Sequence, residues 1–289
     1  MTRALYSTLA AQFTLALACL LLSPACRGQG VTQPKFNTAS EGVRPADVEA
    51  AVATLCSASD ITHAKDGSIS GCKTCPNGTD YQGTTNNSWS LYATSPGHFT
   101  SAKDDDLLID GMGCDSHAMS WGGTYVFSLK EGKPSLLQYD KGLDTSQCFK
   151  AANPDGRDFL VCRTGSTFQG QTSETIFVAN FDSKGNSDTA NLLTVTNAEG
   201  ACDASTTEYA ENPDIRDVKF TYNDSKALTG LTITAAAKVV KCPSVKNGKA
   251  SGKPSSSVKV FELGFVFDGR TFNVAPGSMP AFTLLNSSS

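Results

Sequence analysis

The sequence has little charge, and positive and negative residues nearly balance. Charged residues make up 18% of the 289 residues, and the formal net charge is −4. An average globular domain carries roughly 25% charged residues. Clusters of Lys and Arg are scarce, which excludes nucleic acid as a partner, because such a partner requires a basic face. A disordered chain or a coiled coil would carry more charge, and a coiled coil would contain less Gly.

Long apolar runs are also scarce, and the longest lies near the N-terminus. Residues 9–22 form an apolar run that is too short to span a bilayer and has the length of a signal-peptide core. Arg3 precedes this run, and small residues follow it at 23–28. We therefore interpret residues 1–28 as a signal peptide. The protein is expected outside the cytoplasm, secreted or periplasmic, with no transmembrane helix in the mature chain; an uncleaved anchor is the alternative.

The ten cysteines leave an even number once the signal peptide is removed. Cys19 is lost with the signal peptide, and so is Cys26 if cleavage follows Gly28. If Cys26 is retained, it can instead carry a lipid anchor. The eight that remain are Cys56, Cys72, Cys75, Cys114, Cys148, Cys162, Cys202 and Cys242. An even number in an exported chain predicts four disulfides, and we expect Cys114–Cys148 to be one of them.

The mature chain is predicted to begin with a linker and a small cap. Residues 29–43 are polar and aperiodic, which is typical of a linker. From Pro45 onward, apolar residues between Val48 and Leu55 recur at helical spacing and predict a short helix, the only one expected in the mature protein. Together with the cysteine-containing loop that follows, this helix forms a predicted cap over residues 44–88.

Residues 89–289 are predicted to form an all-β domain with antiparallel strands. Short apolar runs alternate with turns, and no helix of useful length lies between them. The expected strands are residues 89–92, 107–110, 124–129, 135–139, 159–162, 175–181, 192–195, 218–222, 231–235 and 258–267. Asp268-Gly269 predicts a hairpin with a type I′ turn. Residues 241–253 carry four lysines among Gly and Ser and are expected to form a solvated loop.

A short motif occurs twice before predicted strands. Asn153-Pro-Asp-Gly-Arg-Asp158 and Asn212-Pro-Asp-Ile-Arg-Asp217 lie 59 residues apart, and Asp104–Asp106 is a weaker copy. The motif resembles the turn of FG-GAP or integrin-type propeller repeats. This resemblance implies blade-like units, in a partial or degenerate propeller or a β-sandwich. It also implies calcium-type turns, and no other cofactor is expected. The turn residues are Asn153, Asp155, Asp158, Asn212, Asp214 and Asp217.

Two further segments carry residues capable of chemistry. Asp115 and His117 lie two apart, so on a strand they would share a face and could bind a metal, and Asp110 and His98 could join them through folding. Cys72-x-x-Cys75 is followed by Pro76, which breaks a helix, so we expect a structural disulfide, within the pair or to Cys56, rather than a redox or zinc site.

No complete catalytic set is present, which favours binding over catalysis. All three histidines precede Ser120, so the Ser120 region cannot follow the hydrolase order of nucleophile, acid and histidine. Four aromatic residues, Trp89, Trp121, Tyr92 and Tyr125, could stack against a sugar, although core packing is the simpler expectation. We therefore predict an exported, disulfide-stabilised binding or cell-envelope protein, with a glycan or an envelope protein as ligand. The alternative is a secreted hydrolase or metal-dependent enzyme that uses Asp110, Asp115 and His117.

Overall fold

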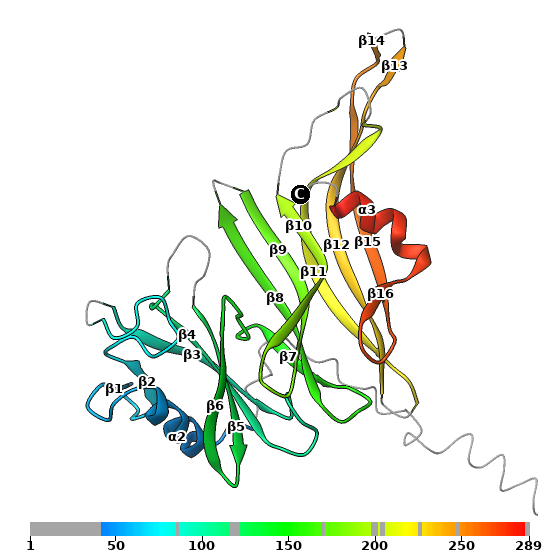
Figure 1. Ribbon diagram of the computed structural model, residues 1–289. Helices are drawn as coiled ribbons and strands as arrows, with labels where there is room; N and C mark the ends of the chain where they lie inside the picture. The colour runs from blue at the N-terminus through cyan, green and yellow to red at the C-terminus, as the bar shows by residue number, and fades with distance from the viewer. Residues whose placement is uncertain are drawn as a thin grey trace, which may run out of the picture. The chain divides into compact units, whose positions relative to one another are not determined.

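The computed structural model describes residues 42–84, 87–115, 122–168, 171–197, 202, 206–224, 227–246 and 249–286. This part of the chain consists of antiparallel β-sheets and two α-helices (Figure 1). The predicted all-β, antiparallel class is therefore confirmed. No sheet within these ranges closes into a barrel or a propeller. Neither of the two α-helices has the length and apolar character needed to cross a membrane.

Sheet A is a six-stranded meander, in which each strand pairs with the next along the chain. Its strands are β1 (Ile61–His63), β2 (Ile69–Cys72), β3 (Trp89–Gly97), β4 (Asp106–Met112), β5 (Gly123–Lys130) and β6 (Lys133–Lys141). The predicted boundary after residue 88 falls between β2 and β3, which pair directly. The predicted cap therefore supplies two strands to the same sheet as the domain that follows it.

Helix α2 (Pro45–Leu55) covers one face of sheet A and confirms the predicted N-terminal helix. Pro45 opens the helix, where its missing N–H costs nothing because the first amides of a helix have no intrahelical acceptor. Ala51 and Val52 are fully buried in a cluster that contains Trp89 and Tyr125 of the sheet. Burial of this apolar face supplies most of the stability of so short a helix.

Two four-stranded sheets follow sheet A along the chain. Sheet B contains β7 (Cys148–Ala152), β8 (Asp158–Phe168), β9 (Gln171–Phe181) and β10 (Ser187–Asn197). Sheet C contains β11 (Glu208–Tyr222), β12 (Leu228–Lys241), β15 (Ser255–Phe267) and β16 (Phe272–Val274). Between β12 and β15, strands β13 (Ser244–Lys246) and β14 (Lys249–Ser251) form a hairpin, which corrects the expected loop conformation; the solvated character of this segment stays a prediction.

Part of sheet B is buried on both faces, because successive side chains of a strand point to opposite sides; residues 165–167, 171–172 and 188–191 of the same sheet are exposed. In β8, Phe159 and Val161 lie in the cluster shared with sheet C. Leu160 and Cys162 lie in the cluster shared with sheet A, where they meet side chains such as Leu108 of β4. Sheet B is therefore the common wall of two cores, and Phe159–Cys162 of β8 and Ile176–Ala179 of β9 are continuous apolar runs.

A second helix closes the core between sheets B and C, so the prediction of a single helix is wrong. The 3-10 turn η2 (Pro276–Ser278) leads into α3 (Met279–Asn286), where Leu285 is fully buried in that core. Phe282 packs edge-on against Phe265 of β15, with ring centroids 6.2 Å apart. The segment has no acidic first turn or basic last turn, so tertiary packing stabilises the helix rather than local signals.

Four disulfides link the eight predicted cysteines, but the expected Cys114–Cys148 bond is wrong. The bonds are Cys56–Cys72, Cys75–Cys114, Cys148–Cys162 and Cys202–Cys242. Cys148 and Cys162 lie directly opposite each other on β7 and β8. Sequence order gave no indication of this pairing, because it depends on which residues the strand register brings together.

The two copies of the turn motif have different local structures. Residues 153–158 form the turn of the β7–β8 hairpin. Residues 212–217 lie inside β11, where the register with β12 shifts, and Asn212 has a φ of 48°. The resemblance to a repeat family stays a prediction.

The predicted hairpin at Asp268 is confirmed, since β15 pairs with β16 through Phe267 and Phe272. Its turn is not of type I′, because positive φ occurs at Gly269 and not at Asp268. The Asp268 carboxylate instead accepts the amides of Arg270 and Thr271 at 2.9 and 2.8 Å.

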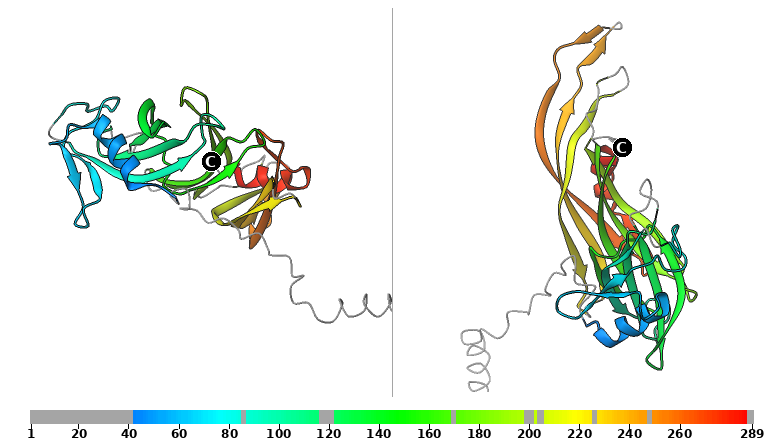
Figure 2. Two further views of the ribbon diagram at one scale, coloured as in Figure 1. Left: turned by 90° about the horizontal axis from the view of Figure 1, so that it is seen from below. Right: turned by 90° about the vertical axis from the view of Figure 1, so that its left-hand side faces the viewer.

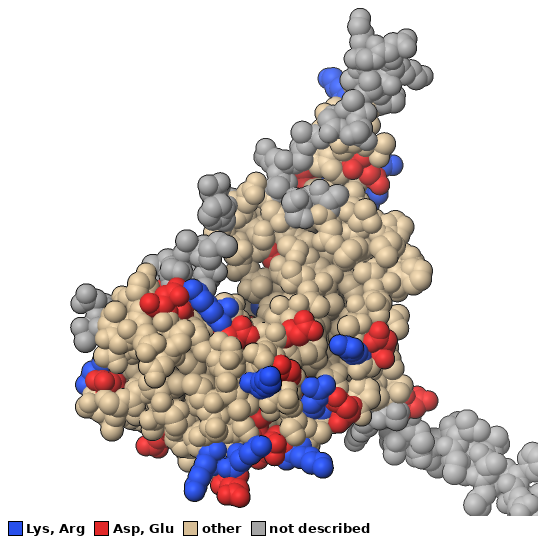
Figure 3. All heavy atoms as spheres, in the orientation of Figure 1, with Lys and Arg blue, Asp and Glu red and all other residues tan. Residues whose placement is uncertain are grey.

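The surface is polar, and both signs of charge are mixed. Figure 3 shows Lys and Arg interspersed with Asp and Glu on the visible face, with few charges over the region of β9, β11 and α3. A ligand on such a surface is recognised more by hydrogen bonds and ring contacts than by a single strong field.

Candidate functional site

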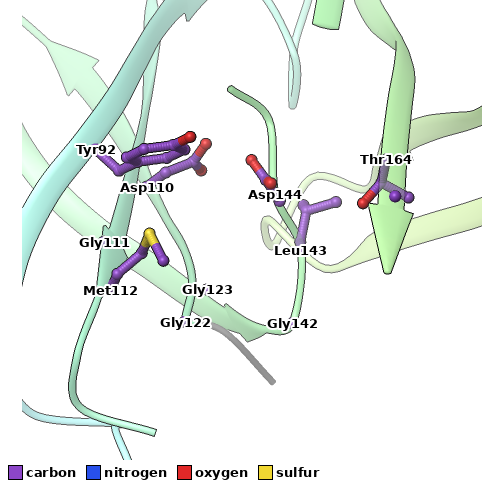
Figure 4. Close-up of a pocket in the computed structure, with 11 residues that line it drawn as sticks. Tyr92, Asp110, Gly111, Met112, Gly122, Gly123, Gly142, Leu143, Asp144 and Thr164 are labelled. Atoms are coloured by element: carbon purple, nitrogen blue, oxygen red, sulfur yellow. The ribbon is translucent and has the colours of Figure 1, made fainter. Parts of the chain in front are cut away.

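A cleft of about 220 Å³ opens beside the end of β4 (Figure 4). Its walls come from β3, β4 and β5 of sheet A, from the segment after β6, and from β8 of sheet B. The lining residues are Tyr92, Asp110, Gly111, Met112, Gly122, Gly123, Gly142, Leu143, Asp144, Thr164 and Gly165. Because five of these are Gly, backbone forms much of the surface.

Asp110 is the buried acid of this cleft. It is 3% exposed and lies on the face of β4 that turns toward sheet B. Its Oδ2 accepts the amide of Thr145 at 2.8 Å and the Thr145 hydroxyl at 2.7 Å. Its Oδ1 lies 2.5 Å from Oγ1 of Thr124 on β5. Asp110 therefore ties two strands of sheet A to the segment that leads into sheet B.

Burial favours a protonated carboxyl at Asp110, whereas the hydrogen bonds from Thr124 and Thr145 act in the opposite direction. Thr124 has one hydroxyl proton, and its Oγ1 also lies 2.8 Å from the carbonyl oxygen of Leu143, which only accepts. If Thr124 donates its proton to Leu143, a hydrogen bond between Thr124 and Asp110 requires Asp110 to be the donor. Asp110 can donate only when its carboxyl is protonated. Burial raises the pKa of Asp110 to about 7, and the nearby charge of Asp144 acts in the same direction.

Tyr92 presents an aromatic ring at the same cleft. Its side chain is 56% exposed, and Figure 4 shows the ring beside the Asp110 carboxyl, with Asp144 and Thr164 farther across the cleft. An exposed tyrosine ring offers an apolar face and a polar hydroxyl, which suits a ligand with both kinds of surface. Tyr92 is the aromatic residue of β3 that does not pack into the core.

Glycine is required where the strands approach closely at the cleft. A Cβ on Gly111 would lie 1.7 Å from Nε1 of Trp89. A Cβ on Gly122 would lie 1.9 Å from the carbonyl oxygen of Gly111, and its φ is +138°, which L side chains rarely adopt. The open floor of the cleft therefore follows from packing constraints beneath it.

A second hollow, of about 350 Å³, continues the cleft across sheet B. It shares Gly142, Leu143 and Thr164 with the cleft and adds hydroxyl and amide side chains. Its lining residues are Asp140, Lys141, Gly142, Leu143, Thr164, Thr175, Phe177, Ser187, Thr189 and Asn191. We call the cleft and this hollow together the Asp110 groove. Its length and polar lining suit a chain-like ligand that carries many hydroxyl groups.

The predicted Asp115 site does not join this groove in the described residues. Asp115 is 3% exposed; its carboxylate accepts the hydroxyl of Tyr139 at 2.5 Å and the amide of Asp80 at 3.1 Å. His117 lies outside the described residues, so its pairing with Asp115 stays a prediction. His98, a candidate to join them, instead contacts the carbonyl oxygen of Asp104 at 3.0 Å. Within the described ranges, no three His, Cys, Asp or Glu side chains are grouped to hold a metal ion.

The first predicted calcium-type turn lies at a separate hollow of about 610 Å³, at the hairpin tips of sheets B and C. Asp155 pairs with Arg157 at 2.9 Å, whereas Asp158 accepts the amide of His98 at 2.8 Å. Asn153 has a buried Oδ1 with no partner among the described atoms. Asp155 and Asp158 therefore contact different partners, and calcium binding at this turn stays a prediction.

The second predicted turn is engaged in surface ion pairs. Asp214 lies 3.6 Å from Arg216, and Asp217 lies 3.6 Å from Lys219. Asn212 is the residue with positive φ in the bulged part of β11. Calcium binding at this turn stays a prediction.

Sequence reasoning predicted Asp110 but missed the groove around it. Thr124, Thr145 and Asp144 carry no motif, and the three meet only because β5 and the segment after β6 pack on β4. One signal was present in the sequence: Asp110 ends the apolar run Leu107–Ile109, so an acid continues a buried strand. A buried acid needs hydrogen-bond partners, and these mark a site.

A search of protein-family models, of curated proteins and of solved structures found no match to this chain. The class of protein is therefore inferred from the structure itself. The protein is β-rich: its described residues form three large antiparallel sheets, the small β13–β14 hairpin and four disulfides. Disulfides in this number are typical of proteins outside the cytoplasm.

Proposed function

We propose that this protein is an exported, non-enzymatic binding protein of the cell envelope, and that its Asp110 groove binds a glycan. The observation that carries the proposal is the exposed ring of Tyr92 beside carboxyl and hydroxyl groups in an open, glycine-lined groove. The segment 1–28, with the character of a signal peptide, supports export. Retention of Cys26 would place the same protein on a membrane surface through a lipid.

The chemistry of the groove matches that of a sugar chain. A pyranose ring has an apolar face of C–H groups that stacks on an aromatic ring, and hydroxyls around its edge that bond carboxylates, amides and hydroxyls. Tyr92 supplies the ring, whereas Asp144 and Thr164 supply polar groups across the cleft. The hollow on sheet B supplies further polar groups for a following sugar unit.

The test is titration of the full mature protein with soluble hexasaccharides of cellulose, chitin and xylan by isothermal calorimetry. We expect at least one to bind with a Kd below about 1 mM. Tyr92→Ala should weaken binding about tenfold, which corresponds to about 1.4 kcal/mol. Tyr81→Ala is the matched control, because Tyr81 is also exposed but does not line the groove. Equal losses for both variants, or no binding to any of the three, would contradict the proposal.

A hydrolase is the second candidate, and the raised pKa of Asp110 favours it. A buried carboxyl that is protonated near neutral pH is the form of a general acid, and glycosidases use such an acid with a second carboxylate. Asp144 is the second acid of the cleft. The same sugars, incubated with the protein and separated by chromatography, distinguish the two functions: shorter products that disappear with Asp110→Asn would support the hydrolase.

A further inference from the structure

Strand β15 has a free edge over most of its length. β12 pairs with residues 255–266 of β15, whereas β16 pairs only with 265–267. The N–H of Gly264 donates to Ser278 Oγ at 2.8 Å, and its carbonyl accepts the amide of Ala275 at 2.8 Å. Both backbone groups of Gly264 therefore point away from β12. The right-hand view of Figure 2 shows β15 at the margin of its sheet.

The backbone of four further residues points the same way. In an antiparallel ladder, the N–H and the C=O of one residue both point toward the strand on one side, and those of the next residue point toward the strand on the opposite side. The register with β12 is regular from 255 to 266, so Ser256, Val258, Val260 and Glu262 face outward as Gly264 does. Within the described residues, no hydrogen bond to these outward groups is found. The edge thus offers four N–H and four C=O groups to a partner strand.

This edge carries exposed apolar side chains beside two charged ones. Val258 and Val260 are 72% and 58% exposed on the outer face of sheet C. Edges are usually blocked by bulges, by Pro or by clustered charge, and an exposed apolar edge is a site for strand pairing. Lys259 and Glu262 form no ion pair with any described residue. They are therefore free to pair with charges on another strand.

Pairing with a second copy of the same strand is disfavoured by charge. An antiparallel pair that uses all four outward residues of both strands places Ser256 opposite Glu262 and Val258 opposite Val260. The centre of that register puts Lys259 directly opposite Lys259 of the other copy. Like charges directly opposite each other are destabilising. Any shifted register would separate the two lysines but would leave outward N–H and C=O groups of β15 unpaired.

We propose that the free edge of β15 binds an extended segment of another protein, which adds to sheet C as an antiparallel strand. The segment carries apolar residues opposite Val258 and Val260, an acidic residue opposite Lys259 and a basic residue opposite Glu262. Backbone hydrogen bonds supply affinity, and the alternating side chains supply specificity. This site is separate from the Asp110 groove and stands whether or not the groove binds a glycan.

The probe is the capped, fluorescein-labelled peptide Lys-Thr-Val-Glu-Val-Thr-Thr, whose Glu falls opposite Lys259 in the proposed register. Binding to the full mature protein is measured by fluorescence anisotropy, beside a control peptide in which that Glu is Lys. We expect saturable binding of the first peptide and at least about tenfold weaker binding of the second. With Lys259→Glu, the preference should reverse. Lys219→Glu, the same charge change on β11, should leave the preference unchanged.

Val260→Pro tests the backbone itself. Proline removes an N–H that points away from β12, so the ladder with β12 loses no hydrogen bond, while peptide binding should weaken about tenfold. Circular dichroism checks that this variant is folded, and the Lys259→Glu reversal does not depend on it. The proposal is overturned if neither peptide binds, if Lys259→Glu retains the wild-type preference, or if sedimentation shows a dimer through this edge that Val260→Pro abolishes.

Discussion

Asp110 shows how neighbours set the behaviour of one residue. Thr124 has two acceptors within reach and one proton to donate, and burial raises the pKa of Asp110 to about 7. Asp106, four residues earlier on β4, is also buried and its pKa is raised by burial, while Thr100 opposes the shift by two kinds of hydrogen bond. The two acids share a strand face but differ in their donors.

The pKa of Asp110 predicts a stability that falls as pH rises. The folded protein keeps a proton that the unfolded chain releases near pH 4, so the unfolding free energy decreases between about pH 4 and pH 7 and is then flat. Asp110→Asn copies the protonated form and removes this component. We expect the difference between wild type and variant to change by up to ~1.4 kcal/mol per pH unit across that window. Urea unfolding at several pH values measures it.

Asp188→Asn is the control for this pH dependence, because Asp188 is an exposed acid of β10. Asp182 and Asp268 are exposed acids whose pKa is lowered by hydrogen bonds. Their contribution to the unfolding free energy is lost as pH falls below about 4, so it has the opposite pH dependence to that of Asp110. Both acids are present in wild type and in Asp110→Asn, so their contributions cancel in the difference between the two unfolding free energies. Parallel curves for wild type and Asp110→Asn would refute the prediction.

At the scale of elements, α3 depends on the core that it closes. Leu285 is fully buried between sheets B and C, whereas Met279, at the other end of the helix, is 47% exposed. The helix is only eight residues long, which is too short to be stable alone in water. Its presence therefore reflects packing, and the packing is concentrated at Leu285.

Leu285→Ala should lower the unfolding free energy by about 2–5 kcal/mol, because it removes a buried side chain and leaves a cavity. Met279→Ala, in the same helix, should change it by less than about 0.5 kcal/mol. Chemical denaturation monitored by circular dichroism measures both. Equal effects of the two substitutions would mean that α3 is not anchored through Leu285.

For the whole molecule, sheet B couples two cores. Leu160 packs toward sheet A and Val161 toward sheet C, so neither core keeps its wall if sheet B unfolds. We expect Leu160→Ala to shift the urea transition seen by tryptophan fluorescence and the one seen by far-UV circular dichroism together. The loss should be about 2–5 kcal/mol. Two separate transitions would show that the cores unfold independently.

Leu136→Ala is the control for that experiment, since Leu136 lies in β6 and is 40% exposed. It should leave both transitions in place, because a surface substitution removes little buried area. Fluorescence follows both tryptophans of the chain: Trp89, which belongs to the core beneath α2, and Trp121, which lies outside the described residues.

Local patterns in the sequence determined the parts of this protein that depend on neighbouring residues. The 3.6-residue spacing after Pro45 predicted α2, the short apolar runs predicted most strands, and Asp268-Gly269 predicted the last hairpin. The even number of cysteines predicted four disulfides. Each of these features is set by spacing along the chain or by residue count.

Only the tertiary structure decided what depends on residues far apart in the chain. Cys148 bonds Cys162 rather than Cys114, because the register of β7 with β8 places Cys148 and Cys162 opposite each other. The same motif forms a hairpin turn at Asn153 and a bulge at Asn212 because different strands pair around each copy. The pKa of Asp110 and the exposure of Tyr92 belong to this second group. Burial and hydrogen-bond partners are supplied by packing, which the local sequence does not contain.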